Sequence, residues 1–337
     1  MTTLWDTTGT AVVKALAAER RTGGAVTSGN ALTLVVVVDR KDTDEAEEAA
    51  TLAASQHPMR MLVVIRRQID APVPRLDAEV TIGGRLGPGE SVVLRMYGRL
   101  ALHAESVTLP LLAPDAPVVT WWHGDAPEKI AYDPLGVFAE RRITDVCRMP
   151  DPSAALQQRA EDFAPGDTDL AWTRLTPWRA ALASAFDSAR HEATSASVRG
   201  GRNEPSARLL SGWLSARLSM DVEVDGSDDE PISGVEIGFA DGKCTRANLE
   251  GGNLVLRRDG QQDSFMPFGE RPLGTLLAEE LRRLDHDHVY AEALSNISGV
   301  EGIEDRPAAR THIWYDPAEA GDESDEKSGA ESGSGSS

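Results

Sequence analysis

Two uninterrupted apolar runs near the start of the chain constrain its fold more than any other feature. Residues 31–39 read Ala-Leu-Thr-Leu-Val-Val-Val-Val-Asp, and residues 60–66 read Arg-Met-Leu-Val-Val-Ile-Arg. Strands that are apolar on both faces belong to a sheet that is covered on both sides, typically a parallel one. The Ala-rich segment between them begins at Asp44, with Glu47 completing a capping box, and ends by His57-Pro58. The sequence therefore predicts a right-handed β-α-β unit in a Rossmann-like layered sheet, preceded by a helix over residues 7–21.

The loops of this predicted sheet lack the glycines that a nucleotide requires. The loop after the first run is Asp-Arg-Lys-Asp-Thr (39–43), with no glycine to let a pyrophosphate approach a helix N-terminus. The glycine-rich segment 83–89 lies between two strand-like segments, 76–82 and 91–100, so we interpret it as a loop that joins two strands. No Walker A motif, zinc-protease motif or nucleophile elbow is present. We expect neither a cofactor nor a catalytic residue.

Composition and charge exclude several classes of partner. The 337 residues carry a formal charge of −20, which disfavours a phosphate backbone, so nucleic acid is not expected to bind. No apolar run reaches the roughly 18 residues that a membrane span needs, and the N-terminus lacks a signal peptide, so we expect a cytoplasmic protein without membrane contact. Cys147 and Cys244 form neither a disulfide framework nor a zinc site. The segment Asp-His-Asp-His (285–288) is interpreted as a turn between helices instead of a metal site.

The order of patterns along the chain predicts four parts. They are an α/β domain (1–150), connecting helices (151–190), an α+β domain (191–296), and a polar linker with a disordered acidic tail (297–337). The α+β assignment depends on short strands joined by Asp-Gly turns at 241–242 and 259–260, which predict an antiparallel meander, and on a closing helix over 273–284. The polar segment 189–204 is interpreted as the boundary between the domains.

The segment Pro165–Arg179 has an unusual composition: two Trp, two Arg and two Asp in fifteen residues. We expect it to start a helix over 169–186 that Pro177 kinks or divides. Trp and Arg are enriched at interface hot spots, which favours a recognition surface. The alternative is a helix that crosses between two domains, packed by Trp and held by internal ion pairs. Composition alone leaves both open.

A second group of aromatic residues ends the strand predicted over 116–124. Trp121 and Trp122 point to opposite faces of a strand, so at least one of them is expected in the core. His123 follows them at the edge of the sheet where ligands of open α/β folds bind. It is a candidate base or phosphate contact, but without a carboxylate placed by motif we favour a loop residue.

The chain also resembles the OpcA family, the glucose-6-phosphate dehydrogenase assembly proteins of bacteria. The resemblance extends from Thr7 to Leu294, and its longest block is Gly-Asp-Thr-Asp-Leu-Ala-Trp-Thr-Arg-Leu-Thr-Pro-Trp-Arg (166–179). Further blocks lie at residues 32–39, 57–66, 76–80, 116–122, 141–145 and 276–285. The resemblance implies a non-catalytic partner that promotes assembly or activity of glucose-6-phosphate dehydrogenase, and so supports the oxidative pentose phosphate pathway and NADPH supply.

Two functional hypotheses follow. In the first, an assembly factor or activator contacts the dehydrogenase through the polar and aromatic residues of the two regions described above, namely Trp121, Trp122, Asp167, Asp169, Trp172, Arg174, Trp178 and Arg179. In the second, the chain is a degenerate Rossmann-like enzyme or a sugar-phosphate sensor, in which Arg60, Arg141 and Arg142 hold the phosphate. Neither hypothesis includes a metal ion.

Overall fold

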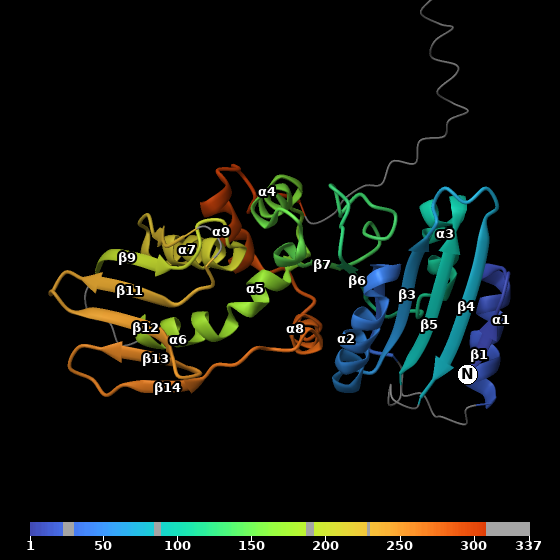
Figure 1. The fold of residues 1–337 in the computed structure, drawn as a ribbon, viewed down its shortest axis with the longest axis horizontal. Helices are drawn as coiled ribbons and strands as arrows, with labels where there is room; N and C mark the ends of the chain where they lie inside the picture. The colour runs from blue at the N-terminus through green and yellow to red at the C-terminus, as the bar shows by residue number, and fades with distance from the viewer. Residues whose placement is uncertain (23–29, 84–88, 187–191, 228–229, 308–337) are drawn as a thin grey trace, which may run out of the picture.

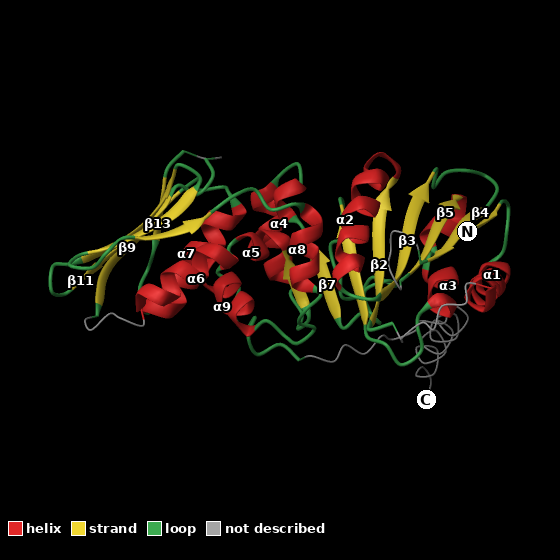
Figure 2. Ribbon diagram, turned by 90° about the horizontal axis from the view of Figure 1, so that it is seen from below, coloured by secondary structure: helices red, strands yellow, loops and turns green. Residues whose placement is uncertain are grey.

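Two β-sheets lie at opposite ends of the molecule, with helices between them (Figures 1 and 2). The computed structural model describes residues 1–22, 30–83, 89–186, 192–227 and 230–307. The glycine-rich loop predicted over 83–89 falls largely outside this part of the chain, and so does the acidic tail. Within the described part, no helix is long and apolar enough to cross a membrane.

The first sheet has eight strands in the order β1-β4-β5-β3-β2-β6-β7-β8. Its six central and distal strands, from β5 to β8 in this order, are parallel, whereas β4 and β1 are added antiparallel at one edge. This confirms an α/β fold with a mixed sheet. The strands are β1 (Thr2–Leu4), β2 (Leu32–Asp39), β3 (Met59–Arg67), β4 (Arg75–Ile82), β5 (Glu90–Tyr97), β6 (Val118–His123), β7 (Arg141–Thr144) and β8 (Asp167–Asp169).

The predicted β-α-β unit is present as β2, α2 (Thr43–Gln56) and β3, with β2 and β3 parallel in register from Leu32 opposite Met59. Seven of the eight β2 residues are buried, because helices cover both faces of the sheet. One face packs against α1 (Gly9–Thr22) and the short α3 (Glu105–Thr108), and the other packs against α2. The continuous apolar sequence of β2 thus reflects a strand without a solvated face.

The helix α8 (Leu273–Glu280) joins α2 on this sheet, although its sequence follows the second sheet. Its Leu276, Leu277 and Ala278 are buried in the same cluster as the alanines of α2. The two helices approach closely at Gly274, where an added Cβ would lie 2.7 Å from the carbonyl oxygen of Ala49. A helix that the sequence places in the second domain therefore completes the cover of the first sheet.

The second sheet has six strands in the order β10-β9-β11-β12-β13-β14. The pair β10-β9 is parallel and all the other pairs are antiparallel. Its strands are β9 (Ala193–Arg199), β10 (Glu223–Asp225), β11 (Gly234–Phe239), β12 (Cys244–Glu250), β13 (Asn253–Arg258) and β14 (Ser264–Pro267). The strand β9 occupies the segment that the sequence suggests as a boundary. The residues of β9 are mostly small or polar and only Val198 among them is buried, so the sequence of this strand lacks an apolar pattern.

The remaining helices form the layer between the sheets: α4 (Pro152–Asp162), α5 (Leu170–Arg174), α6 (Thr176–Phe186), α7 (Pro205–Leu218) and α9 (His288–Ser298). The helix predicted over 169–186 is divided at Leu175, and Pro177 lies in the first turn of α6, where a missing amide costs nothing. Between β5 and β6 the chain forms short turns of helix at Gly98–Leu102, Glu105–Thr108 and Leu109–Leu111.

Candidate functional site

The segment Pro165–Arg179 runs from the first sheet into the helical layer. Its residues Asp167–Asp169 form β8, which pairs in parallel with β7 as the last strand of the sheet. The first sheet therefore extends into the part of the chain (151–190) that the sequence assigns to connecting helices. Gly166, at the start of β8, has a φ of +96°, and an added Cβ would lie 2.3 Å from the carbonyl oxygen of Glu140. Only glycine permits this entry into the sheet.

Buried ion pairs hold β7 to its neighbours. Arg142 forms an ion pair with Asp167 and donates further hydrogen bonds to the carbonyl oxygens of Ala139 (2.8 Å) and Pro165 (2.6 Å). The adjacent Arg141 forms an ion pair with Glu280 at the end of α8. Each arginine is nearly inaccessible, so each charge depends on its carboxylate for compensation. The pairs fix the first sheet to β8 and to α8.

The indole of Trp172 is the centre of a second set of contacts. Its Nε1 donates to Oδ2 of Asp287 at 2.8 Å, and the guanidinium of Arg179 lies 3.7 Å from the ring centroid. Asp287 also caps α9 through Oδ1, so residues 285–287 lie in the turn between α8 and α9, and His288 begins α9. Burial lowers the pKa of Arg179, whose charge is compensated only from a distance by Asp287 and its neighbours. Trp172 thus connects α5 to the start of α9.

A cluster of carboxylates lies where β7 and β8 end. Arg174 forms two hydrogen bonds of 2.7 Å with Asp145. The fully buried Asp169 accepts from the Thr144 hydroxyl at 2.6 Å and from the amides of Ala171 and Val146. Burial, reinforced by the charge of Asp145, raises the pKa of Asp169 to about 6. The carboxylates of Asp145 and Asp169 both have hydrogen-bond partners within the chain, as a structural network requires.

The end of β6 separates its two tryptophans onto opposite faces of the sheet, as predicted, and both are core residues. His123 is the last residue of β6 and is buried, so the interpretation as a loop residue is wrong. Its Nε2 lies 3.2 Å from Oε2 of Glu45 in α2, and Arg148 binds the same carboxylate. Burial lowers the pKa of His123, which favours the neutral imidazole.

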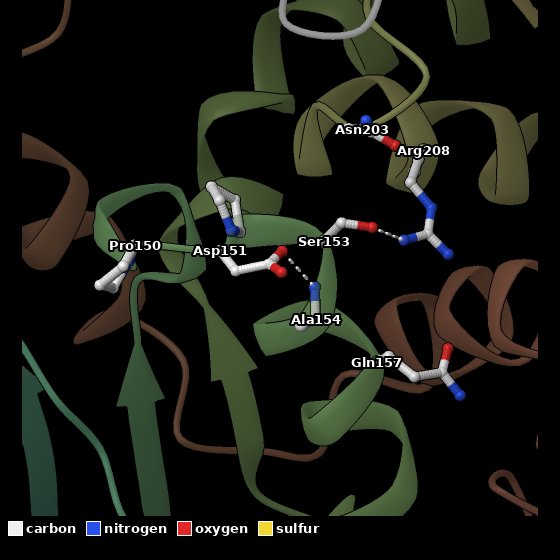
Figure 3. A pocket seen from close by; sticks show the side chains of 8 residues that line it. Pro150, Asp151, Ser153, Ala154, Gln157, Asn203 and Arg208 are labelled. Carbon is white, nitrogen blue, oxygen red and sulfur yellow. Dashed lines mark hydrogen bonds between the residues drawn. The ribbon is translucent and has the colours of Figure 1, made fainter.

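Two cavities adjoin these residues. One, of about 150 Å³, lies at the carboxyl ends of β6 and β7 and is lined by Gly124, Thr144, Asp145 and Arg159 among others. The other is an open groove of about 660 Å³ between the start of α4 and α7 (Figure 3). In the groove Asp151 caps α4 by accepting from the amide of Ala154, and Arg208 donates to the Ser153 hydroxyl at 3.0 Å.

The arginines of the phosphate hypothesis do not form one site. Arg60, at the start of β3, forms an ion pair of 2.7 Å with Glu90 and donates to the carbonyl oxygen of Leu111, whereas Arg141 and Arg142 are engaged at the start of β7. The amino ends of parallel strands lie opposite the edge at which open α/β sheets bind ligands. All three guanidinium groups compensate carboxylates of the chain itself.

The structure buries most of the residues that the sequence suggests for a partner interface. The four tryptophans and both aspartates are each at most 6% exposed. Of the two interpretations that composition leaves open for Pro165–Arg179, the burial of its indoles favours the packed helix, whereas Arg174 and Arg179 are half-buried and reach the surface. Sequence reasoning missed the partners that hold the segment, such as Glu280 and Asp287, because they lie more than 100 residues away without a motif.

Models of known protein families match most of the chain. Two family models match it, and both describe a glucose-6-phosphate dehydrogenase subunit. The model of the N-terminal domain matches residues 50–161, and the model of the C-terminal domain matches residues 165–294. A search of curated proteins finds no match.

Solved structures show only distant likeness. The chain is similar to an oxidoreductase from Sinorhizobium meliloti, with 10% identity and a TM-score of 0.38 over 80% of this chain and 86% of that chain. It is also similar to an NAD binding oxidoreductase from Klebsiella pneumoniae, with 11% identity and a TM-score of 0.39 over 81% of this chain and 96% of that chain. Structural similarity with TM-scores this low supports no conclusion about the activity of this chain.

Proposed function

The chain belongs to the OpcA family of glucose-6-phosphate dehydrogenase assembly proteins, and from this membership we propose that it binds the dehydrogenase and promotes its assembly or activity without catalysing a reaction itself. The observation that carries the proposal is the pair of family matches, which together extend from residue 50 to residue 294. Such a protein supports NADPH supply through the oxidative pentose phosphate pathway.

The carboxyl edge of the first sheet supports a non-catalytic role. The loop after β2 contains no glycine, and α2 uses its first turn to hold His123 and Arg148 through Glu45. The cavity beside β6 and β7 has a volume of about 150 Å³, below the roughly 300 Å³ at which ligand pockets begin. A dinucleotide would have to displace contacts that now stabilise the fold.

The buried network of Pro165–Arg179 suggests how the chain acts as a rigid unit. Thr173 and Trp172 of the segment donate to Glu280 of α8 and to Asp287 at the start of α9, and Arg141 of the first sheet binds the same Glu280. An activator shifts its partner toward the active form only as far as it binds that form more tightly than the inactive one. A surface that is already ordered before binding discriminates between the two forms of the partner without the free-energy cost of becoming ordered on binding.

The proposal is tested by mixing the purified chain with its cognate dehydrogenase. We expect the two to co-elute in size-exclusion chromatography, and we expect the mixture to show a higher rate or a lower KM for glucose 6-phosphate than the dehydrogenase alone. Separate elution together with unchanged kinetics would contradict the proposal.

The sugar-phosphate hypothesis has its own measurement. A ligand that binds only the folded chain raises the melting temperature, by an amount set by its concentration relative to Kd. Because Arg60, Arg141 and Arg142 are engaged with internal carboxylates, we expect no shift with glucose 6-phosphate, 6-phosphogluconate or nicotinamide cofactors. A concentration-dependent rise with any of them would favour a sensor or enzyme instead.

A further inference from the structure

Large apolar side chains are exposed at the corner of the first sheet where β3 and β5 end. The loop 68–74, which leads from β3 to β4, carries Ile69 and Val73, and these are 46% and 70% exposed. Trp5, which follows the edge strand β1, is 67% exposed. Single apolar residues in water are ordinary, but a group of them rimmed by polar residues marks an interaction site.

The loop 68–74 lies against the end of β5. The loop 68–74 folds over Gly98, whose amide donates to the carbonyl oxygen of Gln68 at 3.0 Å and whose position leaves no room for a Cβ beside the carbonyl oxygen of Ala71. Tyr97 precedes this glycine. The guanidinium of Arg75, directly after the loop, lies 5.5 Å from the tyrosine ring.

Trp5 is joined to the same surface through Asp77. The amide of Asp6 donates to Oδ1 of Asp77 at 2.9 Å, and Arg75 binds both oxygens of this carboxylate at 2.8 Å. Val73 precedes Asp77 by four residues, which is about 13 Å of extended chain. This separation is small enough for Trp5 and Val73 to lie in one interface of ordinary size, to which each partner contributes roughly 800 Å² of surface.

The charges at this corner differ from those of the whole chain. Arg67 donates to the Tyr97 hydroxyl at 3.3 Å, and Arg99 is exposed beside it; in the described parts of the chain neither arginine forms an ion pair with a carboxylate. Asp70 in the loop and Asp6 next to Trp5 are exposed carboxylates at the same corner, and Arg75 holds the carboxylate of Asp77. In a chain with a net charge of −20, two arginines without an ion pair beside apolar side chains point to an acidic partner surface.

We propose that this corner, formed by Trp5, Arg67, Ile69, Val73, Tyr97 and Arg99, is the surface that binds the dehydrogenase, whose facing surface presents apolar side chains bordered by carboxylates. The inference rests on the proposed function and adds the contact surface to it. A second copy of this chain is the competing occupant, which the self-association measurement below distinguishes from the dehydrogenase. Trp, Tyr and Arg are also the residues enriched at interface hot spots.

The test measures the Kd between the full chain and the cognate dehydrogenase for two variants, each with a matched control. Val73→Asp places a carboxylate in the apolar centre and is expected to weaken binding at least about 30-fold, in the range of a hot-spot residue. Its control is Phe265→Asp, which alters a similarly exposed side chain on β14 at the other end of the molecule.

The second variant, Arg99→Glu, is expected to weaken binding about 10-fold and to reduce the salt dependence of binding. Its control is Arg202→Glu, in the exposed turn before α7.

Both controls are expected to bind within twofold of the original chain, and the melting temperature verifies that each variant is folded. If Val73→Asp does not fold, Trp5→Ala tests the same surface. Equal binding by the corner variants and the original chain overturns this inference and leaves the proposed function intact. Failure of the original chain to bind overturns the proposed function and this inference together. If the variants abolish only self-association, measured by sedimentation, the corner binds a second copy and the inference is wrong.

Discussion

Two regions of this molecule share a composition but differ in the burial of their tryptophans. The segment Pro165–Arg179 and the corner around Tyr97 both combine tryptophan with arginine. In the first, Trp172 is 1% exposed and Arg174 binds Asp145, whereas in the second Trp5 is 67% exposed and Arg99 has no ion pair in the described chain. Residue types therefore do not distinguish an internal strut from a recognition surface. The burial of the indole does, because Trp172 packs inside the chain and Trp5 lies at its surface.

The strongest test of this contrast is the same substitution at the two tryptophans. Trp172→Ala removes a buried indole, its hydrogen bond to Asp287 and its contact with Arg179. We expect the free energy of unfolding, measured by denaturant titration, to fall by about 4 kcal/mol, as for other buried aromatic truncations.

Trp5→Ala provides the comparison. Because the indole is exposed, we expect the free energy of unfolding to change by less than about 0.5 kcal/mol. If the corner binds the dehydrogenase, this variant weakens the complex while leaving the fold intact. Similar losses of stability at both positions would contradict the distinction between strut and surface.

A somewhat smaller effect is expected from breaking a buried ion pair. Asp167→Ala leaves Arg142 without its carboxylate, although the guanidinium keeps its bonds to the carbonyl oxygens of Ala139 and Pro165. We expect a loss of about 3 kcal/mol in the free energy of unfolding, because an uncompensated buried charge is costly. The matched control is Asp263→Ala, which removes a carboxylate from exposed Arg257 and is expected to cause no measurable change. Equal losses of unfolding free energy in both variants would show that burial does not determine how much an ion pair stabilises the fold.

The sequence predicts those parts of the fold that local patterns determine. The β2-α2-β3 unit follows from two apolar runs around an Ala-rich helix, and Pro177 predicts the division of the long helix. The strand β8 has no such pattern: its Asp-Thr-Asp sequence resembles a helix cap, and only pairing with β7 makes it a strand.

The position of the candidate site in the fold cannot be predicted from local sequence patterns either. Glu280 binds Arg141 across 139 residues, and α8 packs on α2 after the chain has formed a second sheet. No periodicity within either segment encodes such contacts. The exposed corner depends on the same kind of information, because only the pairing of β1 with β4 brings Trp5 to the start of β4, which follows the loop 68–74.

The mildest test of the strut uses pH. Burial and the charge of Asp145 raise the pKa of Asp169 from an ordinary 3.8 to about 6. Between about pH 4 and pH 6 the folded chain keeps a proton that the unfolded chain has lost, so this residue lowers the free energy of unfolding as the pH rises. Asp169→Asn removes the ionisation. The free energy of unfolding of the original chain minus that of the variant is therefore expected to fall by about 2 kcal/mol from pH 4 to pH 7, at about 1.4 kcal/mol for each unit of pKa shift. Denaturant titrations at intervals of half a pH unit provide the measurement. A difference that rises with pH would mean that the carboxylate is stabilised as an anion, and that the network around β8 favours charge at its centre.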